Sequence, residues 1–289
     1  MIITNKYNLP AQFVSMAREE YEYKPKQYSV TSLLKGTREV ILQRRYHKQV
    51  TADVSEMVWM LFGRALHHIL EQHQEGESEL KEQYLRMDIG NGYYLSGRSD
   101  LYCADTKTIT DYKTASVWKV KFQDFDDLRQ QLLLYGLLYR DAGFEVENGE
   151  GVLFLKDHSK SKARYDKDYP KLPVHKEQFE FSRQDFENIK DFAVDKFQEL
   201  AIAEDLPDER LPLCTEAERW NTGDSYAVMK KGRKSALRVL DSEEEAEEWI
   251  ENTGKGDYIE YRSGEDKKCN DYCNVNEFCD YYQKLKKEA

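Results

Sequence analysis

The spacing of apolar residues changes twice between residues 55 and 140, and this constrains the fold more than any other feature of the chain. Residues 55–74 carry apolar side chains at every third or fourth position, which predicts a helix with one buried stripe. The stretches 92–103 and 108–114 are typical of strands, and the turn-forming segment Ala-Asp-Thr-Lys between them predicts a hairpin. Residues 126–140 return to helical spacing. This order predicts helices packed against a small sheet.

Further elements complete the expected fold. Residues 28–46 begin with Ser and Thr capping candidates and predict a short N-terminal helix. Residues 151–156 and 175–181 predict strands, and residues 185–203 predict a helix. The predicted class is therefore α/β, a small mixed sheet with helices on its faces. The expected buried residues are Val58, Leu61, Phe62, Ala65, Leu66, Ile69 and Leu70 of the helix at 55–74, and Leu128, Gln131, Leu132, Leu134, Tyr135, Leu138 and Tyr139 of the helix at 126–140.

Length and charge restrict the function classes. With 289 residues, 40% of them hydrophobic, the chain can bury at least one full core. The net charge of -11 argues against a polycation that coats nucleic acid, so any polyanion must be met locally. The longest apolar stretch, around Leu132–Leu138, is shorter than the roughly 18 residues of a membrane span. The N-terminal residues do not read as an export signal, so we expect a cytoplasmic protein and no membrane partner.

Asp111 and Lys113 carry the first chemical signal. They leave the same face of a predicted strand, while Tyr112 points to the other face. Antiparallel pairing can bring Asp100 beside Asp111, and two clustered carboxylates favour a cation between them, with Mg²⁺ or Mn²⁺ as the best match. Lys113 would then orient or deprotonate a metal-bound water, which is chemistry for cleaving a phosphodiester. Taken alone, Asp-x-Lys is more typical of a solvated cross-strand ion pair.

The order of four short motifs resembles the RecB-type nucleases of the PD-(D/E)XK superfamily. These motifs are Gly63-Arg-Ala-Leu-His67 on a helix, Gly97-Arg-Ser-Asp100, Asp111-Tyr-Lys113, and Gln131-Leu-Leu-Leu-Tyr135. The resemblance covers about residues 28–140 and implies a restriction-endonuclease-like core. One departure is Ser99, because the family pattern has Pro before this Asp.

The resemblance also implies roles for individual residues. His67, Asp100, Asp111 and the carbonyl of Tyr112 would hold the metal, Lys113 would be the catalytic lysine, and Gln131 and Tyr135 would contact DNA or support the site. A lone helical His is also commonly a packed or solvent-facing residue. His67 is preferred to its neighbour His68 because it lies on the same strip as Gly63, where a small residue lets another backbone come close.

Four of the five cysteines lie in the C-terminal part of the chain, as Cys214 followed by the trio Cys269, Cys273 and Cys279. Four thiolates bind either Zn²⁺ or an iron-sulfur cluster, and spacing alone does not choose. The arrangement resembles the four-cysteine iron-sulfur site of AddB-type and CRISPR-adaptation nucleases, which implies a [4Fe-4S] cluster with a structural role. It departs from that pattern in the spacing of the trio and because Cys214 follows the core. Cys103 is expected to be a small buried hydrophobe.

Two basic segments are candidates for contact with DNA. Residues 228–238 hold five basic residues and no acidic one, and residues 156–171 hold six basic and three acidic residues together with Tyr165 and Tyr169. Basic segments with aromatic residues suit single strands or strand ends. The alternative for each is an ordinary solvated loop.

The sequence therefore predicts an N-terminal helical segment (1–54), a nuclease core (55–205) and a Cys-rich metal-binding region (206–289). The expected function is a Mg²⁺- or Mn²⁺-dependent deoxyribonuclease, by resemblance an exonuclease of recombination, repair or replication, with a recombinase or helicase as the expected kind of protein partner. Two alternatives remain. One is a non-catalytic DNA-binding accessory subunit that keeps the fold, and the other is a scaffold whose only metal is structural zinc.

Overall fold

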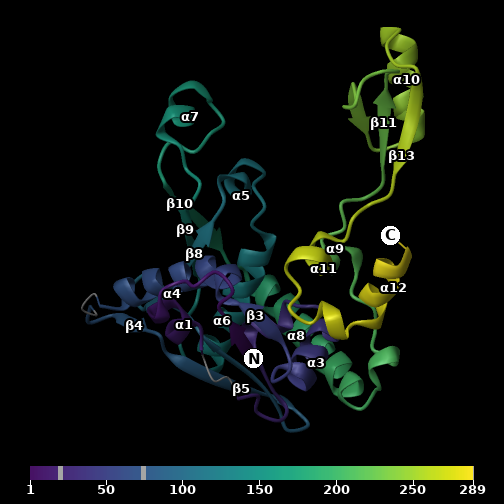
Figure 1. Cartoon of the computed structure of the whole chain (residues 1–289). Coiled ribbons are helices and arrows are strands. Elements are labelled where there is room, and N and C mark those ends of the chain that lie inside the picture. The colour runs from purple at the N-terminus through teal and green to yellow at the C-terminus, as the bar shows by residue number, and fades with distance from the viewer. Residues whose placement is uncertain (19–21, 73–75, 289) are drawn as a thin grey trace. The chain divides into compact units, whose positions relative to one another are not determined.

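Helix α6 (Asp126–Asp141) is buried along most of its length, and several helices and strands of the first unit of the protein pack against it. In the computed structural model, which describes residues 1–18, 22–72 and 76–288, the chain divides into one unit of Met1–Leu211 and another of Pro212–Ala289 (Figure 1). All seven residues that the sequence placed on the inner face of this helix are buried, so that prediction is confirmed. The predicted division into three parts stays a prediction.

A five-stranded mixed sheet lies against α6. Its strand order is β10-β9-β8-β7-β4, with β8 and β9 parallel and the other pairs antiparallel. The strands are β4 (Glu79–Lys81), β7 (Leu101–Cys103), β8 (Thr108–Ala115), β9 (Asn148–Leu155) and β10 (Val174–Glu180). The predicted class, α/β with a small mixed sheet flanked by helices, is confirmed.

The predicted strand 92–103 is divided between two sheets. Its first part, β6 (Tyr93–Arg98), pairs with β2 (Gln27–Ser29) and β5 (Tyr84–Gly90), whereas β7 pairs with β8. The expected hairpin is therefore limited to β7 and the start of β8, and the chain changes sheets at Ser99 and Asp100. Alternation of residue types does not reveal such a break, because each half is a regular strand by itself.

The expected single helix over 28–46 is wrong. Its first residues belong to β2, and two helices follow, α2 (Val30–Leu33) and α3 (Thr37–Tyr46). The predicted cap is present, since the Ser29 side chain accepts a hydrogen bond from the backbone N–H of Ser32. The helix does not continue because Gly36 has φ -59° and ψ 137°, and α3 starts anew after it.

The helix predicted over 55–74 forms as α4 (Val58–Glu71), preceded by the 3-10 turn η1 (Val54–Met57). Residues 73–74 of that prediction lie outside the described residues. The expected buried stripe is only partly present. Leu61 is buried, but Phe62 and Ile69 are 51% and 67% exposed, and the other four are half-buried. The spacing of apolar residues shows which side chains share a helix face, but it does not show whether another element covers that face.

The remaining elements of the first unit are β1 (Ile2–Thr4), α1 (Ala11–Ala17), β3 (Thr51–Asp53), α5 (Val117–Lys121), α7 (Lys160–Tyr165), α8 (Arg183–Glu204) and η2 (Asp208–Arg210). Strands β1 and β3 pair in parallel. Helix α8, predicted over 185–203, begins with a capping box between Ser182 and Asp185 and packs against α6 and α3. Within the described parts of the chain, none of the helices combines the length and apolarity needed to cross a membrane.

The second unit contains a three-stranded antiparallel sheet and a group of short helices. The elements are α9 (Glu216–Arg219), β11 (Ser225–Met229), β12 (Arg238–Leu240), α10 (Glu243–Thr253), β13 (Tyr258–Arg262), α11 (Lys267–Asp271), η3 (Asn276–Phe278) and α12 (Asp280–Glu288). Asp266 accepts hydrogen bonds from Arg219, Asn221 and Tyr281, so it ties together the chain on both sides of this sheet.

Glycines allow α6 to approach the strands. A Cβ atom at Gly97 of β6 would lie 2.8 Å from the Tyr135 ring, and one at Gly151 of β9 would overlap the side chain of Leu128. At Gly63 of α4, by contrast, the nearest atom would be Thr114 Oγ1 at 3.8 Å, an ordinary contact. The close backbone approach expected at Gly63 is therefore absent among the described residues.

We expect Gly151→Ala to lower the free energy of unfolding by about 1–3 kcal/mol, because the added methyl group overpacks the contact with Leu128. The measurement is urea unfolding followed by circular dichroism. Gly63→Ala is the matched control, since it adds the same methyl group inside a helix without a clash and should be neutral or stabilising by up to about 1 kcal/mol. Equal unfolding midpoints for wild type and Gly151→Ala would contradict this packing.

Candidate metal and active site

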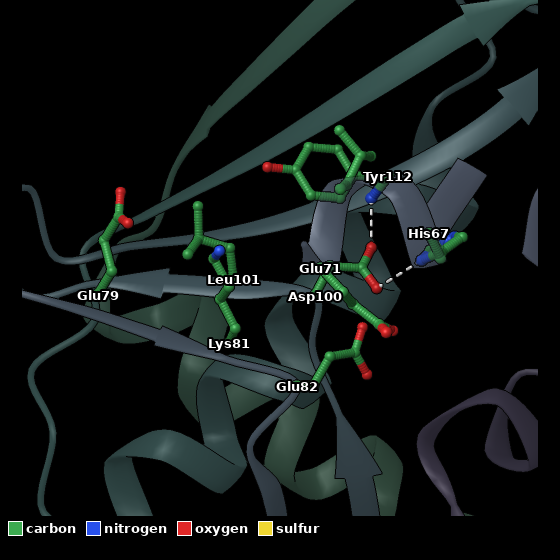
Figure 2. Close-up of a pocket in the computed structure, with 9 residues that line it drawn as sticks. His67, Glu71, Glu79, Lys81, Glu82, Asp100, Leu101 and Tyr112 are labelled. Carbon is green, nitrogen blue, oxygen red and sulfur yellow. Dashed lines mark hydrogen bonds and ion pairs between the residues drawn. The ribbon is translucent and has the colours of Figure 1, made fainter. Parts of the chain in front are cut away.

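A pocket of about 180 Å³ lies where α4, β4, β7 and β8 meet (Figure 2). It is lined by His67, Leu70, Glu71, Glu79, Lys81, Glu82, Asp100, Leu101 and Tyr112. These residues come from four elements and from the break between β6 and β7. The pocket therefore depends on the tertiary fold rather than on one local motif.

Asp100 occupies the break between the two strands and uses both carboxylate oxygens. Its Oδ1 lies 3.0 Å from His67 Nδ1, and its Oδ2 accepts a hydrogen bond from the backbone N–H of Tyr112, as the dashed lines in Figure 2 show. The neighbouring Ser99 is buried and donates a hydrogen bond to the hydroxyl of Tyr139 on α6. The kink is thus anchored to α4, α6 and β8.

Glu82 joins this pair, and the sequence did not single it out. One ligand atom each of His67, Glu82 and Asp100 lies within 4.8 Å of the others. Glu82 directly follows β4, has a positive φ of 47° and donates its backbone N–H to the carbonyl of Asp100 at 3.3 Å. Its local sequence contains several acidic residues, so nothing in the pattern distinguishes it. The left-handed backbone, a conformation that concentrates at functional sites, is visible only in the structure.

The electrostatics of this cluster favour a cation. Burial, reinforced by the negative charge of Asp100, raises the pKa of Glu82 to about 7. The hydrogen bond to Asp100 raises the pKa of His67, and the charges of Asp100 and Asp111 act in the same direction. Burial and neighbouring negative charge thus disfavour the charged form of Glu82, while the same negative charge favours a proton on His67, and a divalent ion would offset both effects. Two carboxylates and an imidazole suit a hard metal such as Mn²⁺ or Mg²⁺.

A second group of predicted residues lies along β8 and α6. Lys113 Nζ is 3.1 Å from Oδ1 and 3.0 Å from Oδ2 of Asp111. Gln131 Nε2 donates to Asp111 Oδ1 at 3.0 Å and to the Tyr135 hydroxyl at 3.3 Å. Gln131 and Tyr135 are both buried. The four side chains therefore form one connected chain of polar contacts.

The Asp111 carboxylate is poorly compensated for its burial. Only 3% of the residue is exposed, and this burial raises its pKa, as does the charge of Asp100, while Lys113 acts in the opposite direction. Its Oδ2 has the ion-pair contact with Lys113 but no hydrogen-bond partner within the described residues. Buried acceptors are normally satisfied, so this oxygen is suited to a ligand supplied from outside the chain, such as a metal ion.

The structure distributes the predicted site residues over these two groups. His67 and Asp100 lie together with Glu82, while Asp111, Lys113, Gln131 and Tyr135 lie together beside them. The two groups are close enough for the charge of Asp100 to affect the pKa of Asp111. Tyr112 meets Asp100 through its backbone N–H, and the role of its carbonyl as a metal ligand stays a prediction.

The four C-terminal cysteines influence one another in the second unit. Burial raises the pKa of the Cys269 thiol to about 12, and the charges of Asp266, Cys273, Cys214 and Cys279 contribute in the same direction. A metal centre would reverse this penalty by stabilising the thiolates. Cys103, expected to be buried, is only half-buried on β7 of the first unit. None of the five, all of them described residues, forms a disulfide.

A comparison with protein families matches residues 18–280 of the chain to the family model of the PD-(D/E)XK nuclease superfamily. No curated protein matches the chain significantly.

Several solved structures show a remote likeness. SSO0001 is 18% identical, with 65% of this chain and 81% of that chain covered and a TM-score of 0.46. The alkaline exonuclease LHK-Exo from Laribacter hongkongensis is 12% identical, with 61% and 89% covered and a TM-score of 0.38. A phage-related exonuclease from Haemophilus somnus 129PT is 13% identical, with 66% and 79% covered and a TM-score of 0.29.

We expect the chain to bind Mn²⁺ in a calorimetric titration, and Glu82→Gln to weaken that binding about tenfold or more, because the variant removes an oxygen ligand and one negative charge. Glu79→Gln is the matched control, since Glu79 lines the same pocket but is not one of the three clustered residues. Equal affinities for wild type and Glu82→Gln would exclude Glu82 from the metal site.

Proposed function

The chain belongs to the PD-(D/E)XK nuclease superfamily, and we propose that it is a Mg²⁺- or Mn²⁺-dependent deoxyribonuclease with exonuclease action. Nucleases of this superfamily use divalent metals. The observation that carries the proposal is the convergence of His67, Glu82 and Asp100 beside the buried Asp111 and its ion-pair partner Lys113. Carboxylates and a lysine on adjoining strands are the groups that metal-assisted hydrolysis of a phosphodiester needs.

In this proposal, His67, Asp100 and Glu82 would hold the ion. Asp111 would contribute Oδ2, the buried oxygen that has no hydrogen-bond partner among the described residues, and the Tyr112 carbonyl would be a further ligand, as the RecB-type resemblance implies. A bound divalent ion supplies an acidified water and a positive charge next to the phosphate oxygens.

The residues on β8 and α6 position the reaction. Lys113, with 39% of its side chain exposed, orients the attacking water and stabilises the negative charge that develops on the phosphate. Gln131 holds the Asp111 carboxylate in place, and the Tyr135 hydroxyl holds Gln131. Because both are buried, we assign Gln131 and Tyr135 to support of the site rather than to contact with DNA.

DNA is the proposed substrate, engaged as single strands or ends, with the basic segments 156–171 and 228–238 meeting the phosphates. We assign the activity to recombination, repair or replication, where a helicase or recombinase is the partner that would supply such ends. A non-catalytic accessory subunit remains the rival function, and it differs in one measurable way. It binds DNA with or without a divalent metal and never cleaves it.

For the second unit we propose a [4Fe-4S] cluster held by Cys214, Cys269, Cys273 and Cys279, with a structural role. The charges of the other three thiols contribute to the raised pKa of Cys269, which supports a centre shared by the four residues. The resemblance to AddB-type nucleases favours iron and sulfide over Zn²⁺. A metal clip also fits a region that is made of short helices and strands, because ligand bonds supply ordering that a small core does not.

We expect Lys113→Ala to lower the rate of DNA cleavage with Mn²⁺ by about 100- to 1,000-fold, because the charge that forms on the phosphate loses its closest ammonium group. The assay measures nucleotide release from end-labelled single- and double-stranded DNA. Lys107→Ala is the matched control. Lys107 directly precedes the same strand at its other end and pairs with Glu145 and Glu147, so its loss should leave the rate unchanged.

Undiminished cleavage by Lys113→Ala would refute the assignment of this lysine. DNA binding by the wild-type protein without any cleavage in Mg²⁺ or Mn²⁺ would instead support the accessory-subunit alternative.

We expect protein purified without oxygen to be brown and to contain about four iron atoms per chain, as a [4Fe-4S] cluster requires. Cys273→Ser should lose most of this iron, whereas Cys103→Ser, on β7 of the first unit, should retain it. Iron and acid-labile sulfide analysis checks both variants. A colourless protein that carries one zinc ion per chain would contradict the iron-sulfur cluster and support structural zinc.

A further inference from the structure

Large aromatic side chains are exposed around the end of β8, a few residues beyond Lys113. Trp118 and Phe122 on and after α5 are 52% and 74% exposed, and their rings stack with centroids 5.6 Å apart at an angle of 21°. Trp59 and Phe62 on α4 are 58% and 51% exposed and meet edge to face at 6.3 Å. Exposed apolar groups of this size commonly mark a binding surface.

Both aromatic pairs are fixed near the same strand end. The Lys156 backbone N–H donates to the carbonyl of Ala115, the last residue of β8, while its ammonium group lies 4.9 Å from the Trp59 ring centroid. The Val117 N–H at the start of α5 is held by Asp157 at 2.8 Å. In Figure 1, α5 follows directly from β8.

A cavity connects the Trp118–Phe122 pair to the candidate active site. It has a volume of about 450 Å³, and it is lined by Lys113, Thr114, Ala115, Ser116, Trp118, Lys119, Phe122, Asp124, Asp127, Leu128, Gln131 and Leu153. The proposed catalytic lysine and the stacked rings thus line the same cavity. A ligand that fills this cavity touches both.

The charge of the adjoining basic segment 156–171 favours an anionic ligand. Two of the three acidic residues of this segment are engaged with α5 and its cap, since Asp166 pairs with Lys121 and Asp157 accepts hydrogen bonds from Ser116 and Val117. The six basic residues of the segment are all exposed. Phosphates would meet these cations, and the aromatic rings offer faces to bases.

The structure corrects one expectation for segment 156–171, the exposure of Tyr169. Tyr169, expected to be one of the aromatic side chains that meet DNA, is 5% exposed, and its hydroxyl accepts a hydrogen bond from the backbone N–H of Ser159. Tyr165 is 85% exposed. The stacking surface therefore lies on α5 and α4 rather than on Tyr169.

We propose that Trp118 and Phe122 form a platform on which a nucleobase of single-stranded DNA stacks, with the phosphates on segment 156–171 and the strand leading to Lys113. This inference rests on the proposed function, and it names the form of DNA that the site takes. A paired base in a duplex hides its face in the base stack, so the platform selects unpaired nucleotides. Stacking on aromatic side chains is tolerant of sequence, which suits a nuclease that degrades any strand.

The test measures binding of a labelled oligothymidylate of about 16 nucleotides by fluorescence anisotropy, in EDTA, so that cleavage does not enter. We expect the double variant Trp118→Ala/Phe122→Ala to bind about tenfold or more weakly than wild type, and a blunt duplex of equal length to lose much less affinity. Trp118→Phe should retain most of the affinity because it keeps an aromatic face. Tyr7→Ala, which removes a 72% exposed aromatic residue outside this surface, should bind as wild type does.

Unchanged affinity of the double variant for the oligothymidylate would overturn the inference, and so would an equal loss for single strand and duplex, because stacking does not explain either. A change in oligomeric state of the double variant, measured by sedimentation, would assign the surface to a second copy of the chain and also overturn it. If the double variant fails to fold, Phe122→Ala alone, with quenching of Trp118 fluorescence by the oligonucleotide, decides the question. A strong quench that is absent in Trp118→Phe supports the platform, and no quench overturns it.

The outcome is separable from that of the proposed function. Wild-type protein that binds single strands through the platform but never cleaves them would refute the nuclease activity alone. Protein that cleaves DNA while the double variant binds the oligothymidylate normally would refute the platform alone.

Discussion

The site depends on the position of one carboxylate, that of Asp100, at the point where the chain leaves one sheet and enters the other. Its two oxygens meet His67 of α4 and the backbone N–H of Tyr112 on β8, while the preceding Ser99 is bonded to Tyr139 of α6. In a strand that continued straight through this point, the Asp100 side chain would simply project from one face of the sheet. It would then lack the arrangement that joins this point to α4, β8 and α6. The break therefore brings together elements that are distant in the sequence.

Burial of several acidic groups around Asp100 creates an electrostatic cost that the protein alone does not remove. The raised pKa values of Glu82 and Asp111 share two causes, burial and the charge of Asp100. Lys113 compensates Asp111 only in part, since Asp111 Oδ2 has no hydrogen-bond partner in the described part of the chain. Such an arrangement is unfavourable for folding by itself, and it is consistent with a site shaped for a cation and an anionic substrate.

The surroundings of this centre are organised by β8. The strand carries Asp111 and Lys113 in its middle and leads directly into α5, so the chemistry and the exposed rings of Trp118 and Phe122 are joined by a few residues of rigid backbone. Close packing of α6 onto the neighbouring strands, which Gly97 and Gly151 permit, keeps Gln131 and Tyr135 at fixed positions behind Asp111. A site on such a frame needs little ordering when a ligand binds.

The sequence by itself determined the long helices α4, α6 and α8, the strands β8, β9 and β10, the inner face of α6 and the shared face of Asp111 and Lys113, because residue period and spacing along one element are local properties. Only the tertiary structure decided the break at Asp100, the recruitment of Glu82 and the exposure of Phe62 on α4. Each of these features depends on which distant segment of the chain packs beside the residue concerned. For example, Glu82 joins the site because the turn after β4 lies next to Asp100. The pattern of a single chain segment carries no information about that neighbour, since burial and charge coupling arise between elements and not within them.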